Sequence, residues 1–66
     1  MRVVANGREV ELTEGAGLLD LFHVLGVGAK WVVAEVNGEA VSRAGMAGVR
    51  LSEGDRVELV RAVAGG

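Results

Sequence analysis

Apolar residues recur at alternate positions on either side of Asn6-Gly7, although Val4, which would lie on the other face, is apolar as well. The apolar positions that would share one face are Met1, Val3, Ala5, Val10 and Leu12. Period-2 alternation is typical of a strand with one buried and one solvated face. Asn-Gly is the strongest short hairpin signal, because both residues tolerate the positive φ of a type I′ turn. Residues 1–12 are therefore predicted to form a β-hairpin.

The period then changes to that of a helix. Apolar residues recur at i, i+3, i+4 and i+7, namely Leu18, Leu21, Phe22 and Leu25. Asp20 and His23 fall on the opposite side, as in an amphipathic helix packed on a core. Gly26 follows the last apolar position, where a C′ glycine would lie. Gly17 is the expected N-cap, although serine, threonine or aspartate would be a better one.

The second half of the chain returns to strand-like patterns. Residues 31–36 form the most strand-like run, and Asn37-Gly38 after it is a second turn signal. Residues 39–41 could pair briefly across that turn. Residues 42–49 hold two glycines and are expected to be irregular, and a turn precedes the last alternating run at residues 56–60.

The predicted order is β, β, α, β, a short piece and β, in a single domain spanning residues 1–66. Two hairpins around one helix favour an α+β fold of the β-grasp type, with a mixed sheet curled over that helix. The connection through the helix is right-handed if the second and third strands are parallel neighbours. Residues 64–66 are expected to be a mobile tail. The expected core is Val3, Ala5, Val10, Leu12, Leu18, Leu21, Phe22, Leu25, Ala34, Val36, Val57 and Leu59.

Composition removes several classes of function. The 66 residues include no cysteine and one histidine, so thiolate metal sites, zinc constellations and Cys-His or Ser-His-Asp arrangements are hard to build. The net charge of −2 and the lack of a basic block argue against nucleic-acid binding. No apolar run approaches a membrane span, and the N-terminus lacks a signal-peptide layout, so a cytoplasmic location is expected.

Single polar or aromatic residues favour ordinary structural roles. His23 is interpreted as a solvated histidine and Trp31 as a cover over the edge of the core. Lys30, the sole lysine, has no supporting pocket for a Schiff base. The acidic residues Glu9, Glu11, Glu35 and Glu58 are interpreted as a wet sheet face.

Three segments together resemble a known family. They are residues 32–39, with Asn37-Gly38 inside, residues 51–60, with a Glu-Gly-Asp turn, and the closing Gly65-Gly66. These segments are similar to the thiamine-biosynthesis sulfur carrier proteins. The early Asn6-Gly7 and the apolar stripe of the helix also fit, so the resemblance covers the whole chain. The tail and the Glu-Gly-Asp turn are the specific parts. Gly17 departs from the family, which often has threonine or serine there, a difference that affects stability rather than chemistry.

The resemblance implies a ubiquitin-like β-grasp fold and a carrier that is not itself an enzyme. An adenylating, E1-like activating enzyme would use ATP to adenylate the carboxylate of Gly66. Sulfur from a cysteine desulfurase route would then give a thiocarboxylate, which thiazole synthase consumes. Gly66 matches the sulfur-carrying residue, with Gly65 and Ala64 as its tail. The chain has no nucleotide-binding loop, so no bound cofactor is expected and the partner enzyme must bind the ATP.

The tail also suits this role on physical grounds. A free α-carboxyl, with a pKa of about 3.3–3.7, is an anion at neutral pH and a poor electrophile, so it needs activation. Residues without a Cβ enter a narrow channel with the least steric conflict. A terminal Gly-Gly is modest evidence alone in a chain with 11 glycines. It gains weight beside the β-grasp pattern.

The residues just before the tail admit two interpretations. Val60 or Val63 could tuck under the sheet edge. Alternatively Val60, Ala62 and Val63 could form an apolar docking patch. We favour docking, because a carrier must be held by at least two enzymes.

Two other functions remain as alternatives. A molybdopterin-type sulfur carrier shares the fold and often the final Val-Ala-Gly-Gly, but its members are usually longer and often carry prolines before it. This chain has no proline. A ubiquitin-like binding or tagging module would form an amide with a lysine, or use no tail chemistry. A stand-alone enzyme is disfavoured, since acid–base catalysis needs tuned groups in a cleft.

Overall fold

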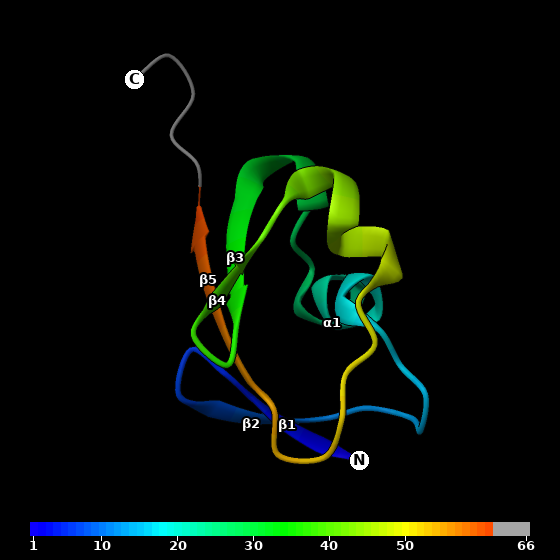
Figure 1. The fold of residues 1–66 in the computed structure, drawn as a ribbon. Coiled ribbons are helices and arrows are strands. Elements are labelled where there is room, and N and C mark those ends of the chain that lie inside the picture. Colours follow the sequence, from blue (N-terminus) through cyan, green and yellow to red (C-terminus); the bar gives the residue numbers. More distant parts are fainter. Residues whose placement is uncertain (62–66) are drawn as a thin grey trace.

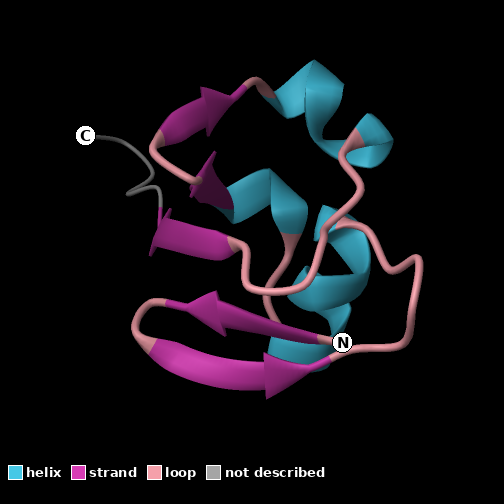
Figure 2. Ribbon diagram, turned by 60° about the horizontal axis from the view of Figure 1, so that its bottom comes forward, coloured by secondary structure: helices cyan, strands magenta, loops and turns pink. Residues whose placement is uncertain are grey.

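A mixed five-stranded sheet forms one layer of the computed structural model, and three helical segments lie together on one side of it (Figures 1 and 2). The structure describes residues 1–61. The strand order across the sheet is β2-β1-β5-β3-β4. The elements are β1 (Arg2–Ala5), β2 (Arg8–Glu11), α1 (Leu18–Leu25), η1 (Ala29–Trp31), β3 (Val32–Val36), β4 (Glu39–Val41), η2 (Arg43–Gly48) and β5 (Arg56–Arg61), where η marks a 3₁₀ helix.

Both predicted hairpins are confirmed. Asn6 and Gly7 have φ of 50° and 81°, and Asn37 and Gly38 have φ of 51° and 86°. Positive φ at both central residues is the type I′ conformation, whose twist matches that of the flanking strands. β1 therefore pairs with β2, and β3 with β4, each across a two-residue loop.

β5 lies between β1, to which it is parallel, and β3, to which it is antiparallel. The second and third strands are not neighbours, so the parallel pairing considered for them is wrong. β1 and β5 separate them, and the connection through α1 passes over both strands. Periodicity identifies strands and their buried faces, but it carries no information on which strands become neighbours.

The core lies between the sheet and α1. Most of the predicted core residues are buried, and Leu18, Leu21, Val3 and Val57 are completely so. Val10, Val36 and Leu59 are only half-buried and pack against its margin. The core also includes four residues that the alternation did not predict: Ala16, Val32, Met46 and Leu51.

Leu25 was predicted to be in the core, and this is wrong, since its side chain is 39% exposed. The helix ends at this residue, and Gly26 turns the chain with φ of 72°. The backbone N–H of Gly26 donates to the carbonyl of His23 at 3.1 Å, and that of Val27 donates to Phe22 at 3.0 Å. These two bonds form a Schellman motif, which confirms the C′ glycine. The stripe of four apolar residues therefore has three buried members.

Gly17 begins α1 where two backbones meet closely. A Cβ built on Gly17 would lie 2.8 Å from the carbonyl oxygen of Val49, which also accepts a hydrogen bond from the backbone N–H of Leu18 at 3.0 Å. The N–H of Gly17 is satisfied instead by the Asp20 carboxylate at 2.8 Å. The expectation that a serine, threonine or aspartate would be a better cap is therefore wrong for this backbone, because its Cβ has no room.

The segment predicted to be irregular, residues 42–49, contains η2. The hydroxyl of Ser42 accepts a hydrogen bond from the N–H of Gly45 at 3.1 Å and caps this short helix. Met46 on η2 is buried and closes one end of the core beside α1. Met46 is the one large apolar residue of η2, and a lone position shows no periodicity, so this helix has no signal in the hydrophobic pattern.

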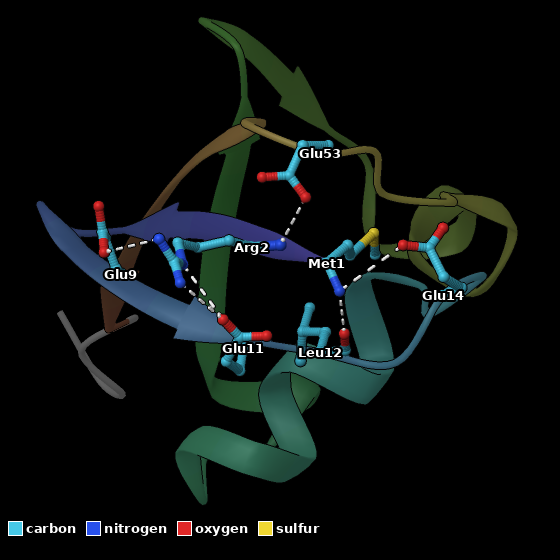
Figure 3. A network of polar contacts seen from close by, with 7 residues as sticks. All are labelled: Met1, Arg2, Glu9, Glu11, Leu12, Glu14 and Glu53. Carbon is cyan, nitrogen blue, oxygen red and sulfur yellow. Dashed lines mark hydrogen bonds and ion pairs between the residues drawn. The ribbon is translucent and has the colours of Figure 1, made fainter.

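The chain start is fixed by polar contacts with β2 and the turn before β5 (Figure 3). The terminal amino group donates to the carbonyl of Leu12 at 2.6 Å. The Arg2 side chain donates to Glu11 at 3.1 Å, and its backbone N–H donates to Glu53 at 2.9 Å. The hydrogen bond to Glu11, followed by the charge of Glu9, raises the pKa of the Arg2 guanidinium. The Arg2 contacts are exposed, and such contacts fix register more than they add stability.

Candidate functional site

The site of interest is the end of β5, since the predicted reactive residue follows it. β5 is the central strand, and Arg61, its last residue, pairs with Val32 at the start of β3. The proposed sulfur-carrying Gly66, the tail residues Gly65 and Ala64, and the docking residues Ala62 and Val63 lie outside the described residues. The structure therefore describes β5, the strand that precedes these residues, and the surface around its end.

A short turn sets the start of β5. The carboxylate of Asp55 accepts a hydrogen bond from the N–H of Ser52 at 2.7 Å, and Gly54 has φ of 83°. The N–H of Gly54 donates to the carbonyl of Arg2 at 2.7 Å, which ties the turn to β1. The Glu-Gly-Asp segment, one of the specific features of the sequence, therefore positions the strand that precedes the tail.

Two asparagines hold β5, Asn37 at its first residue and Asn6 further along the strand. The amide oxygen of Asn6 accepts from the N–H of Leu59 at 2.7 Å, and its amide nitrogen donates to the Leu59 carbonyl at 3.2 Å. The amide oxygen of Asn37 accepts from the N–H of Arg56 at 2.9 Å. The Asn6 contacts continue the β1–β5 pairing beyond Val57, where that ladder ends. The sequence predicted both asparagines only as turn residues, and no local pattern shows their partners on β5.

Val60 points away from the core, on the sheet face opposite α1. Its side chain is 64% exposed, so the interpretation that it tucks under the sheet edge is wrong. Its register partner on β3 is Val33, which is 50% exposed. The sequence analysis did not single out Val33, because the β3–β5 register is needed to bring the two together. We call these two residues the valine pair.

Four glutamates were predicted to form a wet sheet face, and this is confirmed. Glu9, Glu11, Glu35 and Glu58 are all exposed. Glu35 and Glu58 are register partners next to the valine pair along β3 and β5. Like charges placed directly opposite one another are mildly destabilising. The valine pair is therefore an apolar contact point bordered by carboxylates.

Trp31 lies at the same end of the molecule. It belongs to η1 rather than to the strand predicted from residue 31, and it is 53% exposed, so it does not cover the core as expected. Its ring and Arg61 line a groove of about 250 Å³ together with Gly26, Val27, Gly28 and Val32. The base of the tail is therefore flanked by an exposed aromatic ring.

The other polar residues singled out in the sequence do not gather into a metal site within residues 1–61. That stretch of the chain contains no group of three or more acidic, histidine or cysteine residues able to hold a metal ion. His23 and Lys30 are exposed, as predicted. A larger open groove, of about 600 Å³, runs between the loop after β2 and α1, and His23 and Asp20 line it. None of the helices in the described part of the chain is long and apolar enough to cross a bilayer.

A mixed sheet of this order, with one helix across it, is the ubiquitin-like β-grasp fold. Comparison with known proteins then gives the family. Residues 1–66 match the ThiS family, and the chain belongs to it.

Two solved structures are similar to the chain. One is the crystal structure of a thiamine biosynthesis protein (ThiS) from Geobacter metallireducens, 29% identical over 100% of both chains with a TM-score of 0.83. The other is an NMR solution structure of a thiamine biosynthesis protein from Geobacter metallireducens. It is 30% identical over 100% of this chain and 88% of that one, with a TM-score of 0.79. No curated protein matches the chain.

Proposed function

We propose that this protein is the sulfur carrier of thiamine (thiazole) biosynthesis and that the carboxylate of Gly66 carries the sulfur. The observation that supports this most is the ThiS family match, which extends over residues 1–66 and so includes Gly65-Gly66. The likeness to thiamine biosynthesis proteins over the whole length of this chain agrees with it.

In the proposed reaction the activating enzyme binds ATP, and the Gly66 carboxylate attacks the α-phosphorus with loss of pyrophosphate. The resulting acyl-adenylate is an electrophile, which the free carboxylate is not. Sulfide, released when a thiol reduces the persulfide that a cysteine desulfurase route supplies, attacks the acyl carbon and displaces AMP, which leaves with one former carboxylate oxygen. The thiocarboxylate then donates its sulfur to thiazole synthase.

The role of the folded body is to be held while the tail reaches the reaction. Five residues follow Arg61, and an extended chain of that length spans at most about 17 Å. The partner's active site must therefore lie within that distance of the end of β5. Asn6 and Asn37 fix β5 on the sheet, so the start of the tail has a defined position relative to the docking surface.

The valine pair is the proposed contact for these partners, together with Ala62 and Val63. It is apolar and exposed, and its member Val60 lies next to Arg61, the last residue of β5 before the tail. The protein acts in this scheme as a co-substrate and not as an enzyme.

The test is a reconstituted reaction. The full chain, its activating enzyme, ATP and sulfide are incubated, and the product is offered either to thiazole synthase or to the large subunit of molybdopterin synthase. Thiazole formation with the first and no turnover with the second is expected. Turnover only with the second would assign the protein to the molybdopterin type, and an amide bond to a lysine of a partner would assign it to the tagging class.

A further inference from the structure

Charge is distributed unevenly along this acidic chain. All nine acidic residues lie outside residues 21–34, 40–52 and 59–66, whereas four of the seven basic residues lie inside these segments. Three of those four, Lys30, Arg43 and Arg61, belong to η1, η2 and the end of β5 respectively. The acid-free segments therefore carry most of the positive charge.

The fold brings these three elements to one end of the molecule, where β5 ends (Figure 1). Arg43 donates from Nη1 to the carbonyl of Ala29 at 3.0 Å, which joins the start of η2 to η1. Arg61 pairs with Val32, the residue that follows η1. The three cations therefore belong to elements that lie together near the end of β5, although they are far apart in the sequence.

Trp31 provides an apolar centre for this group. Its ring and Arg61 line the groove of about 250 Å³, and Nζ of Lys30 lies 6.0 Å from the ring centroid. The ring is 53% exposed, and a half-exposed tryptophan beside cations is typical of a binding hot spot rather than of a core. We call Lys30, Trp31, Arg43 and Arg61 the basic rim.

The cations of the rim form no ion pair within the part of the chain that the structure describes. Ion pairs among residues 1–61 involve the terminal amino group and Arg2, at the chain start. Lys30, Arg43 and Arg61 have no carboxylate of that region within 4.0 Å. Their positive charge is therefore available to a partner.

We infer that the basic rim docks on an acidic protein surface at the mouth of the channel by which the activating enzyme receives the tail. This inference rests on the proposed carrier function and adds the chemistry of the partner's contact surface. Carboxylates complement the three cations, and an apolar side chain of the partner fills the groove beside Trp31. For a protein of net charge −2, a positive end next to the tail also orients the encounter, since complementary charge steers association.

Nucleotide phosphates are a poorer occupant of the rim. The reacting atoms are those of Gly66, five residues beyond Arg61, and a tail extended in a channel places them up to about 17 Å away. Phosphates bound at the reaction centre would then lie far from the rim. Phosphate groups would also leave the apolar groove beside Trp31 without a complementary partner.

The test is binding of the full chain to its activating enzyme without nucleotide, by isothermal titration calorimetry. Arg61→Glu, Lys30→Glu and Trp31→Ala should each weaken the dissociation constant by about 10-fold or more. Arg56→Glu is the matched control: it makes the same charge change on an exposed residue at the other end of β5, and it should stay within about 2-fold. Added salt should weaken binding of the wild type more than that of Arg61→Glu.

Each other outcome has a definite meaning. If the rim variants and Arg56→Glu bind like the wild type, the inference is wrong while the carrier function stands, provided the wild type forms the thiocarboxylate. If the variants change only the KM for ATP and not nucleotide-free binding, the cations serve phosphates and the inference is wrong. A wild type that neither binds nor is adenylated contradicts the proposed function, and this inference with it. Arg61→Gln, with a smaller expected loss, replaces Arg61→Glu if circular dichroism shows that the latter does not fold.

Discussion

Val33 and Val60 lie directly opposite one another on β3 and β5, and both side chains are exposed on a face otherwise rich in carboxylates. Each residue alone would be an unremarkable surface valine, since single exposed apolar residues are common. The antiparallel register turns the two into a continuous apolar contact point next to the end of the central strand. The face that carries the valine pair is opposite the one covered by α1, so it is open to a partner.

Replacing Val60 with aspartate should weaken binding to the activating enzyme by about 10-fold or more, because a charge in a desolvated apolar contact has no compensating partner. The fold should survive, with a change in unfolding free energy of at most about 1 kcal/mol, since the side chain is exposed. Calorimetric binding and urea unfolding measure the two effects.

Val24→Asp is the control for this change. Val24 is exposed to a similar extent, 58% against 64%, but it lies on α1, across the sheet from the valine pair. The Val24→Asp variant should bind the activating enzyme with nearly wild-type affinity. Equal affinity for both variants would show that the valine pair takes no part in docking, and global unfolding of Val60→Asp would restore the interpretation of Val60 as a core residue.

Asn6→Gly tests whether this asparagine does more than permit the turn. Glycine adopts the φ of 50° without strain, but it removes both hydrogen bonds to the backbone of Leu59. At about 0.5–1.5 kcal/mol for each bond, the variant should lose about 1–3 kcal/mol of stability in urea unfolding. Asn6→Asp keeps only the hydrogen-bond acceptor, and its stability should lie between that of the wild type and that of Asn6→Gly. A neutral or stabilising Asn6→Gly would contradict the role of Asn6 in holding β5.

Gly17→Ser tests the close approach at the start of α1. An N-cap serine gains only a few tenths of a kcal/mol over glycine. Its Cβ, however, would lie 2.8 Å from the carbonyl oxygen of Val49, and displacing that backbone should cost about 1–3 kcal/mol. We therefore expect a net loss of thermal stability by calorimetry. A serine variant as stable as the wild type would mean that the segment after η2 moves aside easily.

The sequence predicted the local elements well because their signals are local. The two Asn-Gly turns, the helix stripe and the C′ glycine all occur where expected. The prediction that Leu25 is buried is wrong because helical periodicity gives the direction of a side chain but does not show where the core beneath the helix ends. The prediction for Trp31 is wrong for a similar reason. An apolar side chain next to a strand shows no signal that separates it from the strand, whereas η1 precedes the strand and leaves the ring exposed.

Contacts between residues distant in the sequence could not be predicted from the hydrophobic pattern. The place of β5 between β1 and β3 brings Val33 to Val60 and Asn6 to Leu59, residues separated by 27 and 53 positions. Neither pairing leaves a periodic trace in the chain. The order of the predicted elements favoured the β-grasp type, and the register then added Val33 as a candidate docking residue that the sequence analysis had missed.

The central claim is that Gly66 accepts the sulfur, and intact-mass spectrometry of the protein after incubation with its activating enzyme, ATP and sulfide tests it most directly. The wild type should gain the mass of one oxygen-to-sulfur exchange, with the change localised to Gly66 by fragmentation. Deleting Gly66 should abolish the gain, because the new end falls short by one residue, about 3.5 Å, and group transfer demands close geometry. An exchange that proceeds at the full rate on the deleted protein, or that maps to another residue, would contradict the account.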